Sequence, residues 1–511
     1  MTPLIAFLLQ KPRRNLIRFL RDLTAAALSL MLIGTAAAKI RPLSRSVSWK
    51  LPGRIGRVFF CDLDRDGRSD VLVFGHSSLE KGAEFVRRLW LCTAAADSPS
   101  VQSVDLRGAT AFDRADMNSD GFTDLIFLCN DGVCILESRA GKLGEEQKTL
   151  IHAVPVFPGP DPMRMIRLPL AADFDLDGNP ELVVPGPDGV GIYSKLDSLY
   201  SVKRTCGIAP RYRFEGDGPD LIVSPPRLTF SDFDGDSRPD LIHVSDARVR
   251  VFLNPSILNH CGRVLNPDLE LDLQSRRLTH SSVDRAVPVS HEIRLADLNA
   301  DGCVDLVLSR AARSGVISTV SQLHLYFNDR GELASFPDQI LTAENVAGEY
   351  RITDMNRDGL KDLVLFNLDI GYTAAARFIL TRKIVHRYET FLMRPDRTYD
   401  PEPDWRFTVK TDPRERPVIS TLTASFTLDD FDGNGFPDLL AATDKDTWTV
   451  FPANSDGAFQ ENDRIEIQAP TGLAHAAADL NGDGASDLIL WDRENPESVL
   501  RIWMSAPEAA P

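Results

Sequence analysis

The nine-residue stretch Asp479-Leu-Asn-Gly-Asp-Gly-Ala-Ser-Asp487 is one of eight closely similar copies along the chain. We number the nine positions of this loop 1 to 9. Position 1 is always Asp, positions 3 and 5 are Asp or Asn, and position 9 is Asp or, in the third copy, Glu. Position 6 is Gly in seven copies and Ser237 in the fourth, which predicts a turn with positive φ. The other seven copies begin at Asp62, Asp116, Asp173, Asp232, Asp297, Asp354 and Asp430.

The residue types at alternating positions of the loop are those that bind a hard cation. Ca²⁺ takes about six to eight oxygen ligands, and carboxylates and amides in a tight turn supply them. Position 7 has no preferred side chain, as expected if its main-chain carbonyl is the ligand. An EF-hand would need flanking helices and Glu at position 12, where most copies have an apolar residue such as Val73 or Leu490. The sequence therefore predicts up to eight Ca²⁺ sites, whose ligands at positions 1, 3, 5, 7 and 9 are Asp62, Asp64, Asp66, Arg68 and Asp70; Asp116, Asn118, Asp120, Phe122 and Asp124; Asp173, Asp175, Asp177, Asn179 and Glu181; Asp232, Asp234, Asp236, Arg238 and Asp240; Asp297, Asn299, Asp301, Cys303 and Asp305; Asp354, Asn356, Asp358, Leu360 and Asp362; Asp430, Asp432, Asn434, Phe436 and Asp438; and Asp479, Asn481, Asp483, Ala485 and Asp487.

A metal-free turn is the alternative for any single copy, because Asp and Asn also satisfy their own backbone in tight turns. Eight copies that keep an acid at positions 1 and 9 argue against it, since about four or five crowded oxygens without a cation would repel one another. Ser237, in place of Gly, makes the fourth loop the weakest of the eight candidate sites.

Each loop is followed by strand-like segments. Position 2 is always large and apolar, and position 10 opens a short apolar run such as Leu488–Trp491, which is typical of a buried strand. Successive loops begin 49 to 76 residues apart, and three further segments of this kind lie between them, for example Arg88–Cys92, Val101–Leu106 and Ala109–Phe112. Four strands per repeat predict an all-β fold, a β-propeller of four-stranded blades in which each loop joins the innermost strand to the second.

The two ends of the repeat region predict how the ring closes. After the eighth loop the chain supplies Leu488–Trp491 and Val499–Trp503 and is one strand short of a blade, whereas Val47–Leu51 is one strand too many before the first loop. Pairing Val47–Leu51 with the last blade would close the ring and leave no exposed sheet edge. Eight blades are therefore favoured, with seven as the alternative if one loop lies outside the ring.

Two stretches fit the repeat less well. The segment Asp217–Val223 resembles a worn fragment of the loop motif. Between the sixth and seventh loops, the charged and Pro-rich segment Arg394–Pro417 is expected to be an extended loop on one face of the propeller.

The eight loops resemble the FG-GAP/VCBS repeats of integrin α-subunit-type β-propellers and their bacterial relatives. The resemblance covers residues 45–505 and implies a single propeller domain over residues 39–511, with Ca²⁺ bound at the blade edges and partners bound by the opposite or upper face. The Phe-Gly and Gly-Ala-Pro elements that give the family its name are hard to find in this chain. Partner specificity does not carry over, because it resides in loops that differ between members.

Residues 1–38 have the pattern of an export signal peptide. Basic residues precede the apolar segment Ala25–Gly34, and the small residues Thr35–Ala38 suit a cleavage site. Arg13-Arg14 loosely resembles a twin-arginine signal, and an uncleaved anchor is the alternative. The rest of the chain has no second apolar segment of spanning length, so we expect a soluble protein that is periplasmic, extracellular or on the cell surface.

The charge and cysteine content exclude some functions. The net charge is −16, but the loops hold 27 carboxylates, so the acidity belongs to the metal sites and does not indicate a basic partner. There is no basic stripe of the kind that binds nucleic acid. Seven cysteines show no zinc-binding spacing, and Cys129 and Cys134 flank an expected hairpin turn, where a disulfide or free thiols would both fit.

The sequence favours binding over catalysis. It has no nucleophile elbow, no His-Glu-x-x-His and no phosphate-binding Gly-rich loop, and His243 and His324 fall on strands where a packed histidine is expected. The first hypothesis is an exported, non-catalytic interaction or adhesion module for a protein or glycan partner. The alternative is a secreted carbohydrate-active enzyme similar to a polysaccharide lyase. Such an enzyme would need Lys, Arg or His side chains that converge on one pocket near bound Ca²⁺.

Overall fold

The computed structural model describes residues 40–76, 86–93, 100–153, 155, 165–196, 199–214, 221–245, 248–255, 264–272, 287–313, 319–344, 349–368, 372–381, 383–411, 426–493 and 499–507. The predicted signal, residues 1–38, lies outside these ranges. No helix within them is long and apolar enough to cross a membrane.

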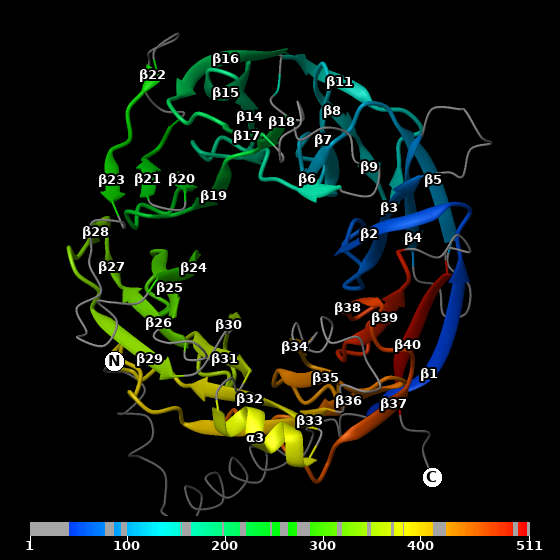
Figure 1. Cartoon of the computed structure of the whole chain (residues 1–511). Coiled ribbons are helices and arrows are strands. Elements are labelled where there is room, and N and C mark those ends of the chain that lie inside the picture. Colours follow the sequence, from blue (N-terminus) through cyan, green and yellow to red (C-terminus); the bar gives the residue numbers. More distant parts are fainter. Residues whose placement is uncertain are drawn as a thin grey trace, which may run out of the picture.

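Eight sheets, each built on four antiparallel strands, are arranged in a ring (Figure 1), and a short fifth strand adds in parallel to one edge of the second and of the third sheet. From the innermost strand outward, blades 1 to 4 are β2 (Arg54–Cys61), β3 (Asp70–His76), β4 (Arg87–Thr93) and β5 (Ser100–Leu106); β6 (Ala111–Ala115), β7 (Asp124–Cys129), β8 (Gly132–Leu136) and β11 (Lys148–His152); β13 (Ala171–Ala172), β14 (Glu181–Gly186), β15 (Gly189–Leu196) and β16 (Leu199–Cys206); and β19 (Arg227–Ser231), β20 (Asp240–Val244), β21 (Arg248–Phe252) and β23 (Leu269–Asp272).

The second half of the ring has the same strand order. Blades 5 to 8 are β24 (Val287–Ala296), β25 (Asp305–Arg313), β26 (Thr319–Tyr326) and β29 (Gln339–Glu344); β30 (Glu349–Thr353), β31 (Asp362–Leu368), β32 (Ile384–Phe391) and β33 (Trp405–Thr411); β34 (Phe426–Asp429), β35 (Asp438–Asp444), β36 (Thr447–Phe451) and β37 (Ile465–Gln468); and β38 (Ala474–Ala478), β39 (Asp487–Trp491), β40 (Val499–Pro507) and β1 (Ile40–Lys50).

The ring closes as the sequence predicts. Strand β1 pairs antiparallel with β40 and becomes the outermost strand of blade 8, with Val47 opposite Ile502 and Trp49 opposite Leu500. The eight-bladed alternative is therefore confirmed over the seven-bladed one. Because the first and last parts of the chain share one sheet, the ring has no free blade edge at the closure.

An apolar core fills each of the eight interfaces between neighbouring blades. The position 2 side chain of each loop lies in the core that its blade shares with the next one, which confirms its predicted role as an anchor. These side chains are all at most 3% exposed. In the order of the blades, starting with the interface between blades 1 and 2 and ending with that between blades 8 and 1, they are Leu63, Met117, Phe174, Phe233, Leu298, Met355, Phe431 and Leu480.

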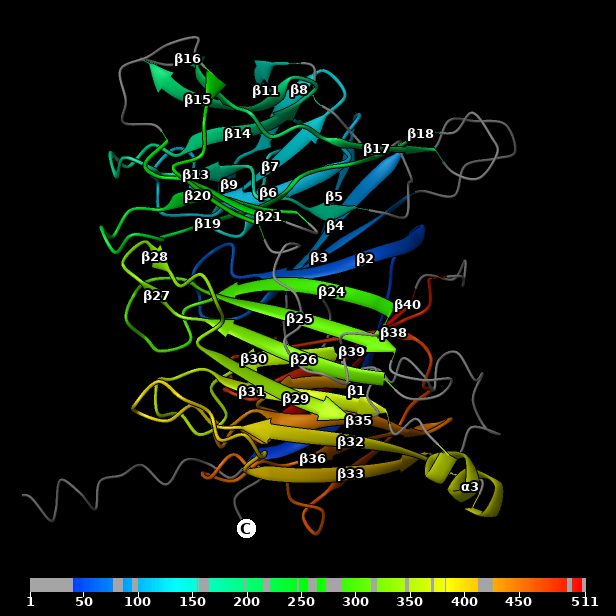
Figure 2. The ribbon, with the colours of Figure 1, turned by 60° about the vertical axis from the view of Figure 1, so that its left-hand side comes forward.

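Short hairpins and one helix lie outside the blades, on the two faces of the ring. Hairpins follow the third strand of blade 2, β9 (Ser138–Arg139) with β10 (Lys142–Leu143), and of blade 5, β27 (Asn328–Asp329) with β28 (Glu332–Leu333). Figure 2 shows β27 and β28 on one face and helix α3 (Tyr372–Thr381), which connects β31 to β32, on the other. The remaining strands are β12 (Ile166–Arg167), β17 (Arg211–Phe214), β18 (Leu221–Ser224) and β22 (Val264–Leu265).

Two expectations about irregular segments need correction. Within Arg394–Pro417, expected to be a loop, residues Trp405–Thr411 form β33, the outermost strand of blade 6, because their side chains alternate between exposed and buried positions. The apolar part of the worn motif, Leu221–Val223, lies in β18, which among the described residues pairs with β17 alone, so it does not begin another blade. Residues 217–220 lie outside the described residues.

The two cysteines of the predicted hairpin turn are free, and the two strand histidines are buried. Cys129 and Cys134 are buried free thiols, and the strand register places them diagonally, since Cys134 is opposite Phe127. The disulfide between them is therefore not present. His243 and His324 are buried on strands, as expected, and burial lowers the pKa of each to about 4, so they are neutral packed side chains.

Candidate metal sites

The loops all connect the innermost strand of a blade to the second strand, and therefore all lie on the same face of the ring. Positive φ at position 6 is confirmed in all eight, including Ser237 with φ of 70°. Position 4 also has positive φ in every loop, a feature the sequence comparison missed. It is Gly in three copies, but Arg65, Ser119, Leu176, Ala300 and Arg357 occupy it in the others.

The predicted ligand side chains are held inside each loop by the loop's own N–H groups. In every copy, position 1 accepts a hydrogen bond from the N–H of position 6, position 3 from that of position 5, position 5 from that of position 7, and position 9 from that of position 2. This bonding alone would also suit a metal-free turn. It orients the side chains at positions 1, 3, 5 and 9 within each loop, whereas their role as metal ligands, and that of the position 7 carbonyl, stay predictions.

Crowding of carboxylates distinguishes these loops from ordinary turns. Where position 3 is Asp, three carboxylates each place one oxygen within 4.8 Å of the others. Like charges at this separation are costly unless a cation or protons are present. The four groups are Asp62, Asp64 and Asp66; Asp173, Asp175 and Glu181; Asp232, Asp234 and Asp240; and Asp430, Asp432 and Asp438.

The position 9 acid is the most deeply buried of the four side chains. Burial, with a smaller contribution from neighbouring carboxylates, raises the pKa of Asp438 to about 8 and that of Asp362 to about 7. Backbone N–H groups act in the opposite direction, for example Met393 N–H, which donates to Asp362 Oδ1 at 2.9 Å. The pKa is also raised by burial at the other six, to about 6 for Asp70 and Asp240, to about 7 for Glu181, Asp305 and Asp487, and in the same direction for Asp124.

One oxygen in the sixth loop has no hydrogen-bond donor. Where position 4 is Gly, Oδ1 of the position 1 Asp accepts the N–H of position 4 at 2.7 Å, and in loops 1, 2, 3 and 5 it accepts that of position 5 at 3.1–3.2 Å. Asp354 Oδ1 is buried and accepts neither. An anionic oxygen shielded from water in this way requires a cation, so the residues present fit a bound metal ion.

Backbone hydrogen bonds join loops of neighbouring blades. In the first, fifth, sixth and eighth loops, the position 8 N–H donates to the carbonyl at position 1 or 2 of the loop before it in the ring. Position 8 is Pro in the third, fourth and seventh loops, which have no N–H to donate. The bonds are Ser69 to Asp479 at 2.9 Å, Val304 to Asp232 at 3.1 Å, Lys361 to Leu298 at 2.8 Å and Ser486 to Asp430 at 2.6 Å.

The turn after the third strand of a blade covers the loop of the preceding blade. Asn328, in the blade 5 hairpin, donates from Nδ2 to the carbonyl of Phe233 in the fourth loop at 2.6 Å. In blade 6, Arg397 Nη1 lies 3.3 Å from Asp301 Oδ2 of the fifth loop. The fifth loop therefore already has one cationic neighbour from the protein itself.

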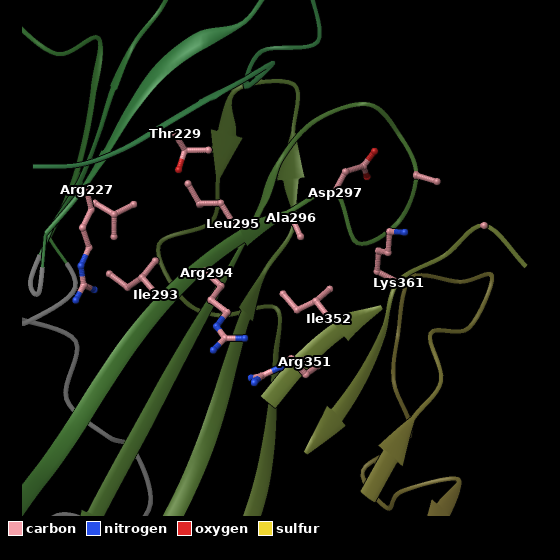
Figure 3. A pocket seen from close by; sticks show the side chains of 13 residues that line it. Arg227, Thr229, Ile293, Arg294, Leu295, Ala296, Asp297, Arg351, Ile352 and Lys361 are labelled. Atoms are coloured by element: carbon pink, nitrogen blue, oxygen red, sulfur yellow. The ribbon is translucent and has the colours of Figure 1, made fainter. Parts of the chain in front are cut away.

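A cavity of about 670 Å³ lies beside the fifth and sixth loops, against the innermost strands β19, β24 and β30 (Figure 3). Its charged lining residues are Arg227, Arg294, Arg351 and Lys361, together with Asp297 from position 1 of the fifth loop. Sequence reasoning missed this site, because its residues come from three repeats and share no local motif. The signal available was an arginine on three successive innermost strands.

Comparison with known proteins supports the repeat assignment. Residues 430–490, which include the seventh and eighth loops, match the model of the FG-GAP-like repeat. A search of curated proteins found no match.

Several solved structures are similar to this chain in overall arrangement. A lectin from Agrocybe aegerita that recognises non-reducing terminal N-acetylglucosamine is 14% identical, with 90% of this chain and 98% of that chain covered and a TM-score of 0.45. The V. cholerae biofilm matrix protein Bap1 is 12% identical, with 93% and 92% covered and a TM-score of 0.31. A rhamnogalacturonan lyase from Bacillus licheniformis is 12% identical, with 91% of each chain covered and a TM-score of 0.25.

Proposed function

We propose, from the premise that this chain is an FG-GAP-repeat β-propeller, that it is a calcium-stabilised, non-catalytic binding module for a protein or glycan partner. The observation that carries the proposal is the set of eight acidic loops on one face, each with a buried acid at position 9. Such a ring holds a rigid surface in place without supplying reactive groups of its own.

Calcium is the ion that the donor set fits best. Every side-chain donor at positions 1, 3, 5 and 9 is an oxygen of Asp, Asn or Glu. Oxygen-only sites built from a short flexible loop suit Ca²⁺, whereas Zn²⁺ and copper prefer nitrogen or sulfur ligands. When bound, the ion would neutralise the crowded carboxylates and link the start of the second strand to the turn before it.

Thermal unfolding tests the stabilising role. Since only the folded loop presents the four side chains together, bound Ca²⁺ would stabilise the folded state through linkage. We expect the melting temperature to fall strongly when the ion is removed with a chelator and to recover when Ca²⁺, but not an equal concentration of Mg²⁺, is restored. An unchanged melting temperature after complete removal would contradict the proposal.

The second candidate is a secreted carbohydrate-active enzyme, and the cavity beside the fifth and sixth loops favours it. Four cationic side chains converge there next to a predicted Ca²⁺ ligand, Asp297, which is the arrangement such an enzyme would need. An absorbance assay for unsaturated uronates distinguishes the two candidates. Product formation from an acidic polysaccharide would replace the binding proposal, and binding without product would support it.

Location outside the cytoplasm is part of the proposal. It rests on the predicted export signal in residues 1–38 and on the supply of Ca²⁺ outside the cell at the level that weak loops require. Fractionation of cells that express the full chain tests it. Recovery of the protein only from the cytoplasm, at its full unprocessed mass, would overturn it.

A further inference from the structure

We infer that the cavity between blades 4, 5 and 6 is the binding site for an acidic saccharide, a sugar chain that carries carboxylate groups. This inference rests on the proposed binding function and specifies its site and its ligand class. It depends on the strand edges that form the wall, on two adjacent arginines and on two further cations at the sides.

The wall of the cavity offers unpaired backbone groups. Strands β19, β24 and β30 are the innermost strands of their sheets, and each pairs with a neighbour on one side only. Five consecutive residues, Ile293–Asp297, line the cavity, so it meets the free edge of β24 rather than one face. Free N–H and C=O groups along such an edge can bind the hydroxyl groups of a sugar.

Two guanidinium groups converge on a single carbonyl. Arg294 Nη1 donates to the carbonyl oxygen of Tyr350 at 2.5 Å, and Arg351 Nη1 donates to the same oxygen at 3.1 Å. The two nitrogens are therefore at most 5.6 Å apart, the sum of those distances. The aromatic ring of Tyr350 also lies under Arg294, with its centroid 4.4 Å from Cζ, and holds that side chain in place.

Both arginines keep donors for a ligand. A guanidinium has five N–H groups. Arg294 directs three toward Glu292 and Tyr350, and Arg351 directs two toward Tyr350 and Glu349. Two donors of Arg294 and three of Arg351 thus have no partner among the described residues, and a planar carboxylate can accept two of them at once.

Arg227 and Lys361 add two cations that form no ion pair among the described residues. Figure 3 shows Arg227 on the blade 4 side of Arg294 and Lys361 toward the sixth loop. No ion pair to either is found within the described part of the chain. The lining has four cations and one carboxylate, Asp297, and Glu292 and Glu349 pair with Arg294 and Arg351, so these seven groups have a net formal charge of +1 in a chain whose net charge is −16. Arg227 and Lys361, which have no ion pair among the described residues, favour an anionic ligand.

The shape and the apolar lining favour a saccharide over a protein surface. An open, concave site of about 670 Å³ suits a short saccharide better than the large flat surface of a protein. Ile293 and Ile352 offer aliphatic contact for the C–H groups of a sugar ring. The lining includes no aromatic side chain, so a neutral sugar that depends on stacking would gain little here.

Titration calorimetry with galacturonate oligomers tests the inference, at a fixed free Ca²⁺ concentration because uronates also bind the ion. Glucose oligomers of equal length are the neutral probe, and polyglutamate is the acidic peptide probe. We expect binding of the galacturonate oligomers alone, weakened at least about tenfold in the double variant Arg227→Ala/Lys361→Ala. Neither residue makes an ion pair among the described residues, so folding should be retained, and the melting temperature in Ca²⁺ checks this.

Lys410→Ala is the matched control, because Lys410 is exposed on β33, the outermost strand of blade 6. It should bind galacturonate oligomers like the wild-type protein. Equal loss in this variant, unchanged affinity in the double variant, or tighter binding of polyglutamate would overturn the inference. A glycan array that finds other ligands, bound equally by the double variant, would leave the binding function intact and place it elsewhere. If the protein bound no glycan on the array and did not bind polyglutamate, both the inference about the cavity and the proposed binding function would be contradicted.

Discussion

Ser69 donates its backbone N–H to the carbonyl oxygen of Asp479 at 2.9 Å and thereby joins the first metal loop to the eighth. Ser69 belongs to the first of the eight loops and Asp479 to the last. The two loops are neighbours because the ring closes between blades 8 and 1, where β1 completes blade 8. The same bond links loops 4 and 5, where Val304 donates to Asp232. Bonds of this kind join loops 4, 5 and 6 in one series and loops 7, 8 and 1 in another, so a change in one of these acidic loops can affect its neighbour.

Ser69→Pro tests this link at the closure. The substitution places Pro after Arg68, at position 8 of the first loop. The fourth loop already has Arg followed by Pro at positions 7 and 8, Arg238 and Pro239, so the backbone of these loops accepts Pro at position 8. We expect the free energy of unfolding to fall by about 1 kcal/mol, because one hydrogen bond is lost and the Asp479 carbonyl keeps no donor. Urea unfolding in Ca²⁺ measures it. Ser69→Ala retains the N–H and should unfold like the wild type, and a similar loss in both variants would refute the role of the bond.

Ser237→Gly should stabilise the fourth loop. Ser237 has φ of 70°, and a side chain in this region costs about 1–2 kcal/mol, partly offset by the entropy that Gly loses on folding. At Gly67 and Gly178, the equivalent positions, a Cβ would meet no other atom within 4 Å, so the cost is conformational rather than steric. We expect a gain of up to about 1 kcal/mol in unfolding free energy and tighter Ca²⁺ binding by this loop. Ser237→Ala keeps the Cβ, and a gain there would argue against this explanation.

The repeat explains how much of the fold could be predicted. Position 2 is apolar in every copy because each one fills a different blade interface, so a single column such as Leu63, Phe233 and Leu480 predicts eight cores. Val47–Leu51 could be placed because a four-stranded blade lacked one strand. Positive φ at position 4 could not, since Arg65 and Leu176 are residues that seldom adopt it, and the surrounding hydrogen bonds impose it.

The remaining errors arose where tertiary packing overrides local composition. Charged and Pro-rich neighbours concealed β33, whose strand pairing with β32 compensates for weak local preference. The cavity cations could not be grouped from sequence, because residues as far apart in the chain as Arg227 and Lys361 line one cavity only when blades 4, 5 and 6 lie side by side in the ring. The candidate metal ligands could be grouped from sequence because each set lies within nine consecutive residues, whereas the cavity residues come from three repeats.

Arg397→Ala should change the dependence of the fifth loop on Ca²⁺. Arg397 Nη1 lies 3.3 Å from Asp301 Oδ2, so its charge partly balances the acidic loop when no metal is bound. The side chain is half-exposed, so we expect a small loss, below about 1 kcal/mol, in the metal-free protein. With Ca²⁺ bound, the loss should vanish and the affinity of this loop should rise, since a competing cation is gone. Arg397→Lys keeps the charge and serves as the control, and equal loss with and without Ca²⁺ would contradict the argument.

The raised pKa values of the position 9 acids predict that a rise in pH lowers the stability of the metal-free protein and raises that of the Ca²⁺-bound protein. The pKa of Asp438 is raised to about 8 and that of Asp362 to about 7, against about 4 in an unfolded chain. Between about pH 4 and pH 8 the metal-free folded protein thus holds protons that the unfolded chain has released, and its stability falls as pH rises. Ca²⁺ requires the deprotonated carboxylates, so its stabilising effect grows with pH.

Melting temperatures measured from pH 5 to pH 8 should therefore decrease with pH after the metal has been removed by dialysis, and increase with pH in saturating Ca²⁺. Asp438→Asn is the control, because an amide at this position neither titrates nor repels Asp432. It should flatten the metal-free curve and reduce the gain from Ca²⁺. Two parallel curves for the wild-type protein would mean that protons and Ca²⁺ do not compete for the same buried oxygens. The eight loops would then be turns stabilised by their own hydrogen bonds and not metal sites.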